Sequence, residues 1–168
     1  RPALYARALR HSSATVERPA ESYERLEFLG DSIIGSVVAS ELYRALPEAP
    51  VGDLSRMKAH LVSEGTLAAA ARALGLGALV VLSAGEEAAG GRDKPSILSD
   101  VFEAVVGAVY LDRGVRAASR VVREALGDAF QLCVAEGVRR DFKSELQERY
   151  QATDRIAPTY RIVATHGA

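Results

Sequence analysis

The sequence of 168 residues contains very little cysteine, since Cys133 is the only one. A single cysteine excludes an internal disulfide and gives no reason to expect an oxidising compartment. The sequence also lacks an apolar run long enough to span a membrane, and its first residues have no apolar core of the kind that signal peptides carry. These absences predict a cytoplasmic protein without a membrane partner.

The sequence has almost no net charge, −1 at pH 7, which by itself argues against a nucleic-acid partner. The charge is unevenly distributed, however. Residues 1–136 contain 15 Lys and Arg against 18 Asp and Glu, a net charge of −3, whereas residues 137–168 contain 6 against 4, a net charge of +2. An acidic site that holds metal cations would explain the negative sign of the larger part and would still allow it to bind phosphate groups.

Apolar residues make up 48% of the sequence, so the chain can bury a sizeable core. Its length suits one full domain and part of a second. Up to residue 136 the apolar residues recur with helical spacing, which predicts an all-α domain over residues 1–136. We expect helices near 4–9, 23–46, 53–62, 66–74, 96–111 and 115–136, loops over 12–21 and 85–94, and a strand-like or helical stretch over 78–83.

The pattern changes after residue 136. Residues 137–141 are typical of a linker, residues 142–150 have the spacing of an amphipathic helix, and residues 158–163 alternate like a strand. One helix and one strand cannot bury a core of their own. Residues 142–168 therefore either begin a second, α+β domain or pack on the first.

Carboxylates on an apolar helix are the most informative feature of the sequence. Glu24, Glu27 and Asp31 are spaced i, i+3, i+7, which places them on one face of the predicted helix 23–46. A buried carboxylate is costly unless it is paired or holds a metal. The alternative is a solvated stripe in which the two glutamates complement the helix N-terminus.

A second pair of acids, Asp100 and Glu103, lies at i, i+3 in the apolar run of residues 97–107. Asp-x-x-Glu is also the pattern of a capping box. Against that alternative, Ile97 and Leu98 already belong to the helix, which puts Asp100 inside it.

These four carboxylates, Glu27, Asp31, Asp100 and Glu103, can converge into one site. The cluster contains neither cysteine nor histidine, so its ligands would all be oxygens, which suits Mg²⁺ or Mn²⁺ better than zinc. Gly30 and Gly107 lie beside the acids and would let the two helices approach closely.

Residues 24–32, with the sequence Glu-Arg-Leu-Glu-Phe-Leu-Gly-Asp-Ser, resemble the signature of the ribonuclease III family. The similarity continues through residues 52–59 and 94–104. It ends in residues 141–148, which resemble the opening of a double-stranded-RNA-binding domain. Order and spacing agree over nearly the whole chain, and the nine-residue motif is far more specific than a bare Glu-x-x-Glu.

The resemblance implies an all-α endonuclease domain of the ribonuclease III type over residues 1–136, a linker over 137–141, and an incomplete double-stranded-RNA-binding domain over 142–168. In the family, that small domain normally continues through two more strands and a second helix. The implied activity is metal-dependent cleavage of double-stranded RNA that leaves 5′-phosphate and 3′-hydroxyl ends with a short 3′ overhang. A role in rRNA or mRNA processing goes with it.

The resemblance also implies roles for individual residues. Glu27, Asp31, Asp100 and Glu103 match the family's metal-binding acids, and Asp31 and Glu103 are the implied catalytic residues. Glu24 matches only in position and is secondary, orienting Arg25 or a water. Phe28 matches an aromatic residue that inserts into a partner subunit, which implies a homodimer whose two clusters each cut one strand. The alternative for Phe28 is plain core packing.

Contacts with RNA are expected from polar side chains outside the cluster, because duplex RNA is read through phosphates and 2′-hydroxyls across its minor groove. Two groups of residues are candidates, and each basic residue has the alternative of being a solvated charge. Beside the acids the candidates are Arg56, Lys58, Arg92 and Lys94; in the second domain, on one helical face, they are Ser144, Gln147, Glu148 and Gln151.

The remaining chemistry-bearing residues do not suggest a further site. His11, His60 and His166 are scattered and are interpreted as surface or locally hydrogen-bonded residues, and Cys133 is expected in the core. Two other functions compete with the nuclease. All-α nucleotide pyrophosphatases also bind magnesium through helical Glu-x-x-Glu motifs, and a non-catalytic RNA-binding module would be expected to lose one or more of the acids.

Overall fold

The computed structural model describes residues 1–15 and 19–136. The chain separates into two units, residues 1–137 and 138–168, of which the first is described below. The linker, helix and strand predicted after residue 136 lie outside the described residues. The same holds for the candidate RNA contacts and the histidine of that segment, namely Ser144, Gln147, Glu148, Gln151 and His166.

The described part of the chain is all-α, as the sequence predicts, and contains no strand longer than a single bridge between Arg10 and Val81. The helices are α1 (Pro2–Ala8), α2 (Glu24–Ala45), α3 (Val51–Leu61), α4 (Glu64–Ala73), α5 (Ala84–Ala88), α6 (Pro95–Arg113) and α7 (Val115–Glu136). Short 3₁₀ turns cover Ser12–Ala14, Pro19–Glu21, Leu76–Leu79 and Gly91–Asp93. None of the described helices is long and apolar enough to cross a membrane.

Three predicted boundaries are wrong, each for a local reason. Helix α3 begins directly after Pro50, so Asp53 lies in its first turn and does not cap it. Helix α4 begins earlier than expected because the side chain of Ser63 accepts a hydrogen bond from the backbone N–H of Thr66. The predicted loop 85–94 contains α5, which Ser83 caps in the same way.

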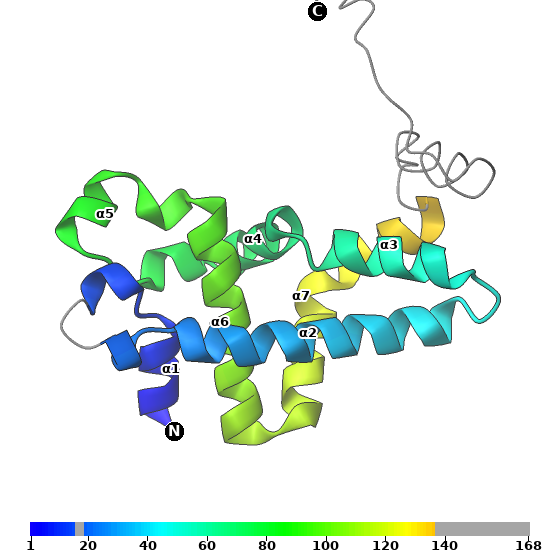
Figure 1. Cartoon of the computed structure of the whole chain (residues 1–168), viewed down its shortest axis with the longest axis horizontal. Coiled ribbons are helices and arrows are strands. Elements are labelled where there is room, and N and C mark those ends of the chain that lie inside the picture. The colour runs from blue at the N-terminus through cyan, green and yellow to red at the C-terminus, as the bar shows by residue number, and fades with distance from the viewer. Residues whose placement is uncertain (16–18, 137–168) are drawn as a thin grey trace, which may run out of the picture. The chain divides into compact units, whose positions relative to one another are not determined.

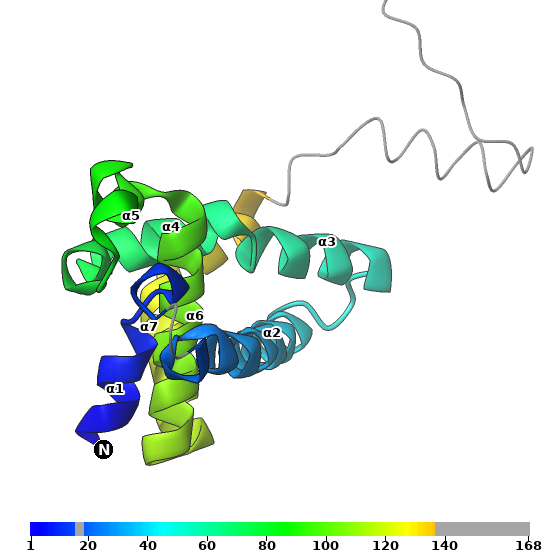
Figure 2. The ribbon, with the colours of Figure 1, turned by 60° about the vertical axis from the view of Figure 1, so that its left-hand side comes forward.

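Helix α6 forms the centre of the core. It packs against α1, α2, α4 and α7, and Figure 1 shows α2 running across it. The turned view in Figure 2 keeps α2 and α6 side by side. Nine of the 19 residues of α6 are buried, among them Leu98, Val101 and Phe102. An acid on this helix is therefore surrounded by packed apolar neighbours.

Two glycines make the close crossing of α2 and α6 possible, as the sequence predicts. A Cβ atom at Gly30 would lie 1.8 Å from the carbonyl oxygen of Glu103, and a Cβ atom at Gly107 would lie 2.3 Å from that of Leu26. Neither distance is compatible with a side chain, so only glycine permits this approach. The crossing brings the acidic residues of the two helices to the same place.

Candidate active site

Four carboxylates from two helices meet where α2 and α6 cross. Glu27 and Asp31 lie on the first half of α2, and Asp100 and Glu103 lie on the first half of α6. Helix α6 begins at Pro95, so Asp100 is in its second turn. This position excludes the capping box as an explanation for the second pair.

The pKa values of the acids record how close the two pairs are. Burial raises the pKa of Glu27 to about 7, and the negative charges of Asp100, Glu24 and Asp31 add to the effect. Burial also raises the pKa of Glu103 to about 8, with further contributions from Asp31, Asp100 and Glu27. Because each glutamate is affected by acids of the opposite helix, the structure brings all four together.

The acids of this cluster lack the partners that other buried acids have. In the described part of the chain, no ion pair and no hydrogen bond reaches the side chains of Glu27, Asp31 or Glu103. By contrast, Asp112 accepts hydrogen bonds from the backbone ammonium of Arg1, from Tyr5 and from Arg113, of which the first contributes most to lowering its pKa to about 2. Leaving partly buried carboxylates unpaired costs stability. Unpaired carboxylates of this kind are typical of a cation-binding site.

The solvated stripe that the sequence allowed describes only part of α2. Glu24 is exposed and accepts a hydrogen bond from the hydroxyl of Ser22 at 3.2 Å, in place of the predicted contact with Arg25. Asp31 is exposed too, but Glu27 is half-buried and its pKa is raised. Of the three acids on this face of α2, only Glu27 is therefore partly shielded from solvent.

Sequence reasoning missed three residues that act on Asp100, namely Tyr23, His11 and Glu64. The phenol of Tyr23 donates a hydrogen bond to Oδ2 of Asp100 at 3.2 Å. Burial raises the pKa of Asp100, the hydrogen bond from Tyr23 and the nearby His11 lower it, and Glu64 at the start of α4 raises it. The only signal for Tyr23 in the sequence was its place directly before the acidic face of α2.

The donor set of the cluster suits a hydrated divalent cation. No three of the described His, Cys, Asp and Glu side chains are arranged so that they could enclose an ion as they stand. Mg²⁺, however, usually keeps several waters and is held by one or two carboxylates together with substrate phosphates. Unpaired oxygen donors that repel one another fit such an ion, because its charge would relieve their repulsion. Burial and the neighbouring acids raise the pKa of two of them, Glu27 and Glu103.

Phe28, between Glu27 and Leu29 on α2, is 78% exposed. Core packing, the alternative for this residue, is therefore wrong within a single chain. The ring therefore lies on the surface of the single chain.

The basic residues predicted near the site differ in their surroundings. Arg56 pairs with Asp53, and Lys94 pairs with Glu86. The side chain of Lys58 is exposed and runs along Gly35, which lies one turn beyond Asp31 on α2.

Arg92 has a structural role. Its Nη1 donates to the carbonyl oxygens of Gly77, Ala78 and Val80 at 3.0, 3.2 and 2.8 Å, and its Nε donates to Glu87. A guanidinium engaged in this way is not available to a phosphate.

The predictions for histidine and cysteine are confirmed within the described residues. Nδ1 of His11 lies 2.8 Å from the hydroxyl of Ser13, so this histidine is locally hydrogen-bonded, and His60 is exposed. Cys133 is buried on α7, and burial raises the pKa of its thiol.

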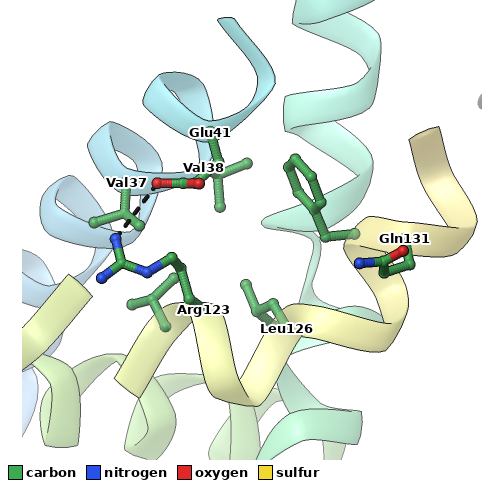
Figure 3. A pocket seen from close by; sticks show the side chains of 8 residues that line it. Val37, Val38, Glu41, Arg123, Leu126 and Gln131 are labelled. Atoms are coloured by element: carbon green, nitrogen blue, oxygen red, sulfur yellow. Dashed lines mark hydrogen bonds and ion pairs between the residues drawn. The ribbon is translucent and has the colours of Figure 1, made fainter. Parts of the chain in front are cut away.

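A separate pocket of about 230 Å³ lies between α2 and α7 (Figure 3). Apolar side chains dominate its lining, and the charged groups at its edge, Glu41 and Arg123, are paired with each other at 3.4 Å. The lining residues are Val37, Val38, Glu41, Val122, Arg123, Leu126, Phe130 and Gln131. With no unpaired ligand for a cation or a phosphate, this pocket is not the candidate active site.

Comparison with known proteins relates the whole described part to one family. A family model described as Ribonuclease-III-like matches residues 1–129. A protein named Ribonuclease 3 from Symbiobacterium thermophilum is 46% identical over 98% of this chain and 70% of its own length. Another of that name, from Geobacter metallireducens, is 43% identical over 96% of this chain and 68% of its own length.

Solved structures agree with these sequence matches. The nuclease domain of ribonuclease III from Campylobacter jejuni, in a structure that concerns flexibility in the region involved in dimer formation, superposes with a TM-score of 0.72 at 38% identity. The match covers 76% of this chain and 87% of that one. Dicer from Pichia stipitis superposes with a TM-score of 0.63 at 25% identity, over 98% of this chain and 74% of that one.

Proposed function

The chain belongs to the ribonuclease III family, and from this premise we propose that it is a metal-dependent endonuclease that hydrolyses phosphodiester bonds in double-stranded RNA. The products would carry 5′-phosphate and 3′-hydroxyl ends. The activity would serve the processing of rRNA or mRNA in the cytoplasm. The cofactor would be Mg²⁺, with Mn²⁺ as a substitute.

One observation carries this proposal: the crossing of α2 and α6 collects four carboxylates and leaves three of them without any partner among the described residues. Such an arrangement has no structural benefit, because burial and mutual repulsion disfavour the charged carboxylates and raise the pKa of Glu27 and Glu103. A phosphodiester is also an anion, so bare carboxylates would repel it. A cluster of this kind becomes useful only when cations bind between the acids and the phosphate.

Glu27, Asp31, Asp100 and Glu103 are the residues that would hold the cations. When bound, divalent cations neutralise the phosphate, lower the pKa of a water and stabilise the leaving oxygen. Glu103 lies deeper in the crossing than the exposed Asp31 and is affected by all three other acids. Its side chain would bind a cation at the buried side of the site, whereas Asp31 would bind at the side exposed to solvent and substrate.

Binding of the duplex would depend on basic side chains beside the cluster. Lys58 is the best placed of the predicted candidates, because its exposed side chain lies beside Gly35, one helical turn beyond Asp31 on α2. Arg56 and Lys94 would have to exchange their present carboxylate partners for phosphates. Further minor-groove contacts would come from the second domain, through Ser144, Gln147, Glu148 and Gln151.

We further propose that the enzyme works as a homodimer in which Phe28 contacts the partner subunit. The exposure of its ring supports this, as does the dimer formation named for the nuclease domain of the Campylobacter jejuni relative. Phe28 directly follows Glu27, so a partner seated on the ring would lie beside the carboxylate cluster. Two clusters in one dimer would each cut one strand of the duplex.

The decisive experiment is a cleavage assay on long duplex RNA with Mg²⁺. Cleavage is expected with the wild-type chain and is expected to disappear with excess chelator and in Glu103→Gln. Glu124→Gln, a change at an exposed glutamate of α7, is the matched control and should cleave normally. Hydrolysis of nucleoside triphosphates in place of RNA would indicate a pyrophosphatase, and duplex binding without cleavage would indicate a non-catalytic module.

A further inference from the structure

The hydroxyl of Tyr23 touches the carboxylate cluster, although the proposed function assigns this residue no task. We infer that Tyr23 is a positioning residue that orients the carboxylate of Asp100 for cation binding. The inference rests on the proposed metal-dependent function and adds to it a fifth residue, one that does not itself bind the metal.

The hydrogen bond divides the two oxygens of Asp100 between two tasks. Oδ2 accepts from the phenol of Tyr23 at 3.2 Å, and within the described residues this is the only hydrogen bond that the carboxylate receives. Oδ1 is therefore left for a cation. A neutral phenol suits this role, because it holds the carboxylate without neutralising it, as a lysine or arginine would.

Tyr23 also fixes the start of the helix that bears the other acids. Its backbone N–H donates to the carbonyl oxygen of Arg10 at 2.9 Å. Its carbonyl oxygen accepts from the N–H groups of Leu26 and Glu27 at 2.7 and 3.0 Å. Tyr23 thus contacts both halves of the cluster. Its carbonyl oxygen accepts from the backbone of Glu27 on α2, and its hydroxyl donates to the side chain of Asp100 on α6.

The ring of Tyr23 is held firmly enough to act as such an anchor. It is only 2% exposed, and its neighbour His11 meets it edge to face with ring centroids 5.6 Å apart. His11 is itself fixed, since its Nδ1 lies 2.8 Å from the hydroxyl of Ser13, which accepts the backbone N–H of Ser83 at 3.1 Å. A locked side chain can hold a ligand in a productive geometry at little entropic cost.

The test compares two tyrosine-to-phenylalanine changes that each remove one hydroxyl bonded to an aspartate of α6. Tyr23→Phe frees Asp100. Tyr5→Phe, the matched control, removes a 3.0 Å hydrogen bond to Asp112, which lies about 18 Å farther along the helix. Mn²⁺ binding to the full chain without RNA is followed by electron paramagnetic resonance, and the binding lost in Glu103→Gln defines the cluster.

We expect Tyr23→Phe to weaken Mn²⁺ binding at the cluster by about 10-fold, the size usual for residues that orient metal ligands, and Tyr5→Phe to leave it unchanged. In the cleavage assay, Tyr23→Phe should raise the Mg²⁺ concentration for half-maximal rate by a similar factor. The rate at saturating Mg²⁺ should stay close to that of the wild type. A loss of folding alone would not produce this separation.

Mn²⁺ binding by Tyr23→Phe within about twofold of the wild type would overturn the inference while the proposed function stands. An equal loss in Tyr5→Phe, or a rate that excess Mg²⁺ does not restore, would overturn it as well. A wild-type chain with no Glu103-dependent Mn²⁺ binding would overturn the metal-dependent function itself, and the inference with it.

Discussion

The two ends of α2 each carry a half-buried glutamate, but only one of the two has basic partners. Near the start of the helix, Glu27 is half-buried, has no ionic partner among the described residues, and has a pKa near 7. Near its end, Glu41 is also half-buried but pairs with Arg44 at 3.0 Å and with Arg123 at 3.4 Å, at the edge of the apolar pocket in Figure 3.

This difference separates a structural acid from a functional one. The structural acid Glu41 is compensated by basic residues of its own helix and of a neighbouring one, Arg44 and Arg123. Where α2 meets α6, glycines allow an approach so close that acids of two helices accumulate without any base. Neither burial nor the presence of a pocket identifies the site, since the pocket beside Glu41 is lined mainly by apolar side chains and its charged groups are paired.

The largest effect should come from breaking the crossing itself. Gly30→Ala places a methyl group against the backbone of Glu103, so the helices must separate. We expect a loss of about 3 kcal/mol or more in the free energy of unfolding, measured by urea titration. Gly127→Ala on α7, where a Cβ meets open space, is the control and should stabilise by about 0.5–1 kcal/mol. Equal effects at the two positions would contradict the close crossing.

The next largest effect is expected on catalysis, from comparing an unpaired acid of the cluster, Glu103, with the paired acid Glu41. Glu103→Gln should lower the rate of RNA cleavage by at least about 100-fold, since even residues behind a metal ligand cost 10–100-fold when removed. Glu41→Gln should change the rate by less than about twofold, because its carboxylate is engaged at the other end of α2. Comparable rates for the two variants would remove the distinction.

A third experiment uses pH. The pKa of Glu103 is raised from about 4.5 to about 8, so the folded state binds this proton more tightly than the unfolded state does. Without metal, stability should therefore fall as pH rises from about 4.5 to 8. Glu103→Gln removes this loss.

The expected gain of Glu103→Gln over the wild type is roughly 1–2 kcal/mol at pH 8.5 with chelator, and close to zero at pH 4. It is smaller than 1.4 kcal/mol per tenfold change in proton affinity would give, because solvent screens a partly exposed group. Urea unfolding at the two pH values measures it. A variant that is less stable than the wild type at pH 8.5 would show that the carboxylate is compensated after all.

The smallest effect is expected on stability, from breaking the ion pair between Glu41 and Arg123. Arg123→Ala should lower the free energy of unfolding by no more than about 1 kcal/mol, because Arg123 is half-exposed and such ion pairs contribute little. The change should shrink further at 1 M salt. A loss of several kcal/mol would mean that this end of α2 depends on its charges as strongly as the other end does.

Much of the site could be predicted because the relevant signals are local. The spacing of Glu27 and Asp31 fixes their common face, and Ile97 ahead of Asp100 places that acid inside a helix. Small residues beside acids also predicted the close crossing at Gly30. For the two acidic pairs, the pattern and its structural consequence lie within a few residues of each other. The crossing joins distant segments, but each helix carries its own glycine beside its acids.

The parts that could not be predicted depend on contacts between distant segments. Tyr23 and Asp100 are 77 positions apart, and nothing in either neighbourhood indicates the other. The pairing of Lys94 with Glu86 was not predicted either, because it depends on the short helix α5 lying beside Lys94. A helix of five residues has too few positions to show a periodicity.

Arg92 has a consequence for the dynamics of the domain. Three carbonyl groups of the segment 77–80, those of Gly77, Ala78 and Val80, accept hydrogen bonds from one nitrogen of its side chain. The order of this segment therefore depends in part on one rotamer of Arg92, beside the segment's own 3₁₀ turn and the bridge between Arg10 and Val81. When that rotamer is lost, the segment can open alone while α2 and α6 stay packed, so its amide protons should exchange with solvent well before those of the core.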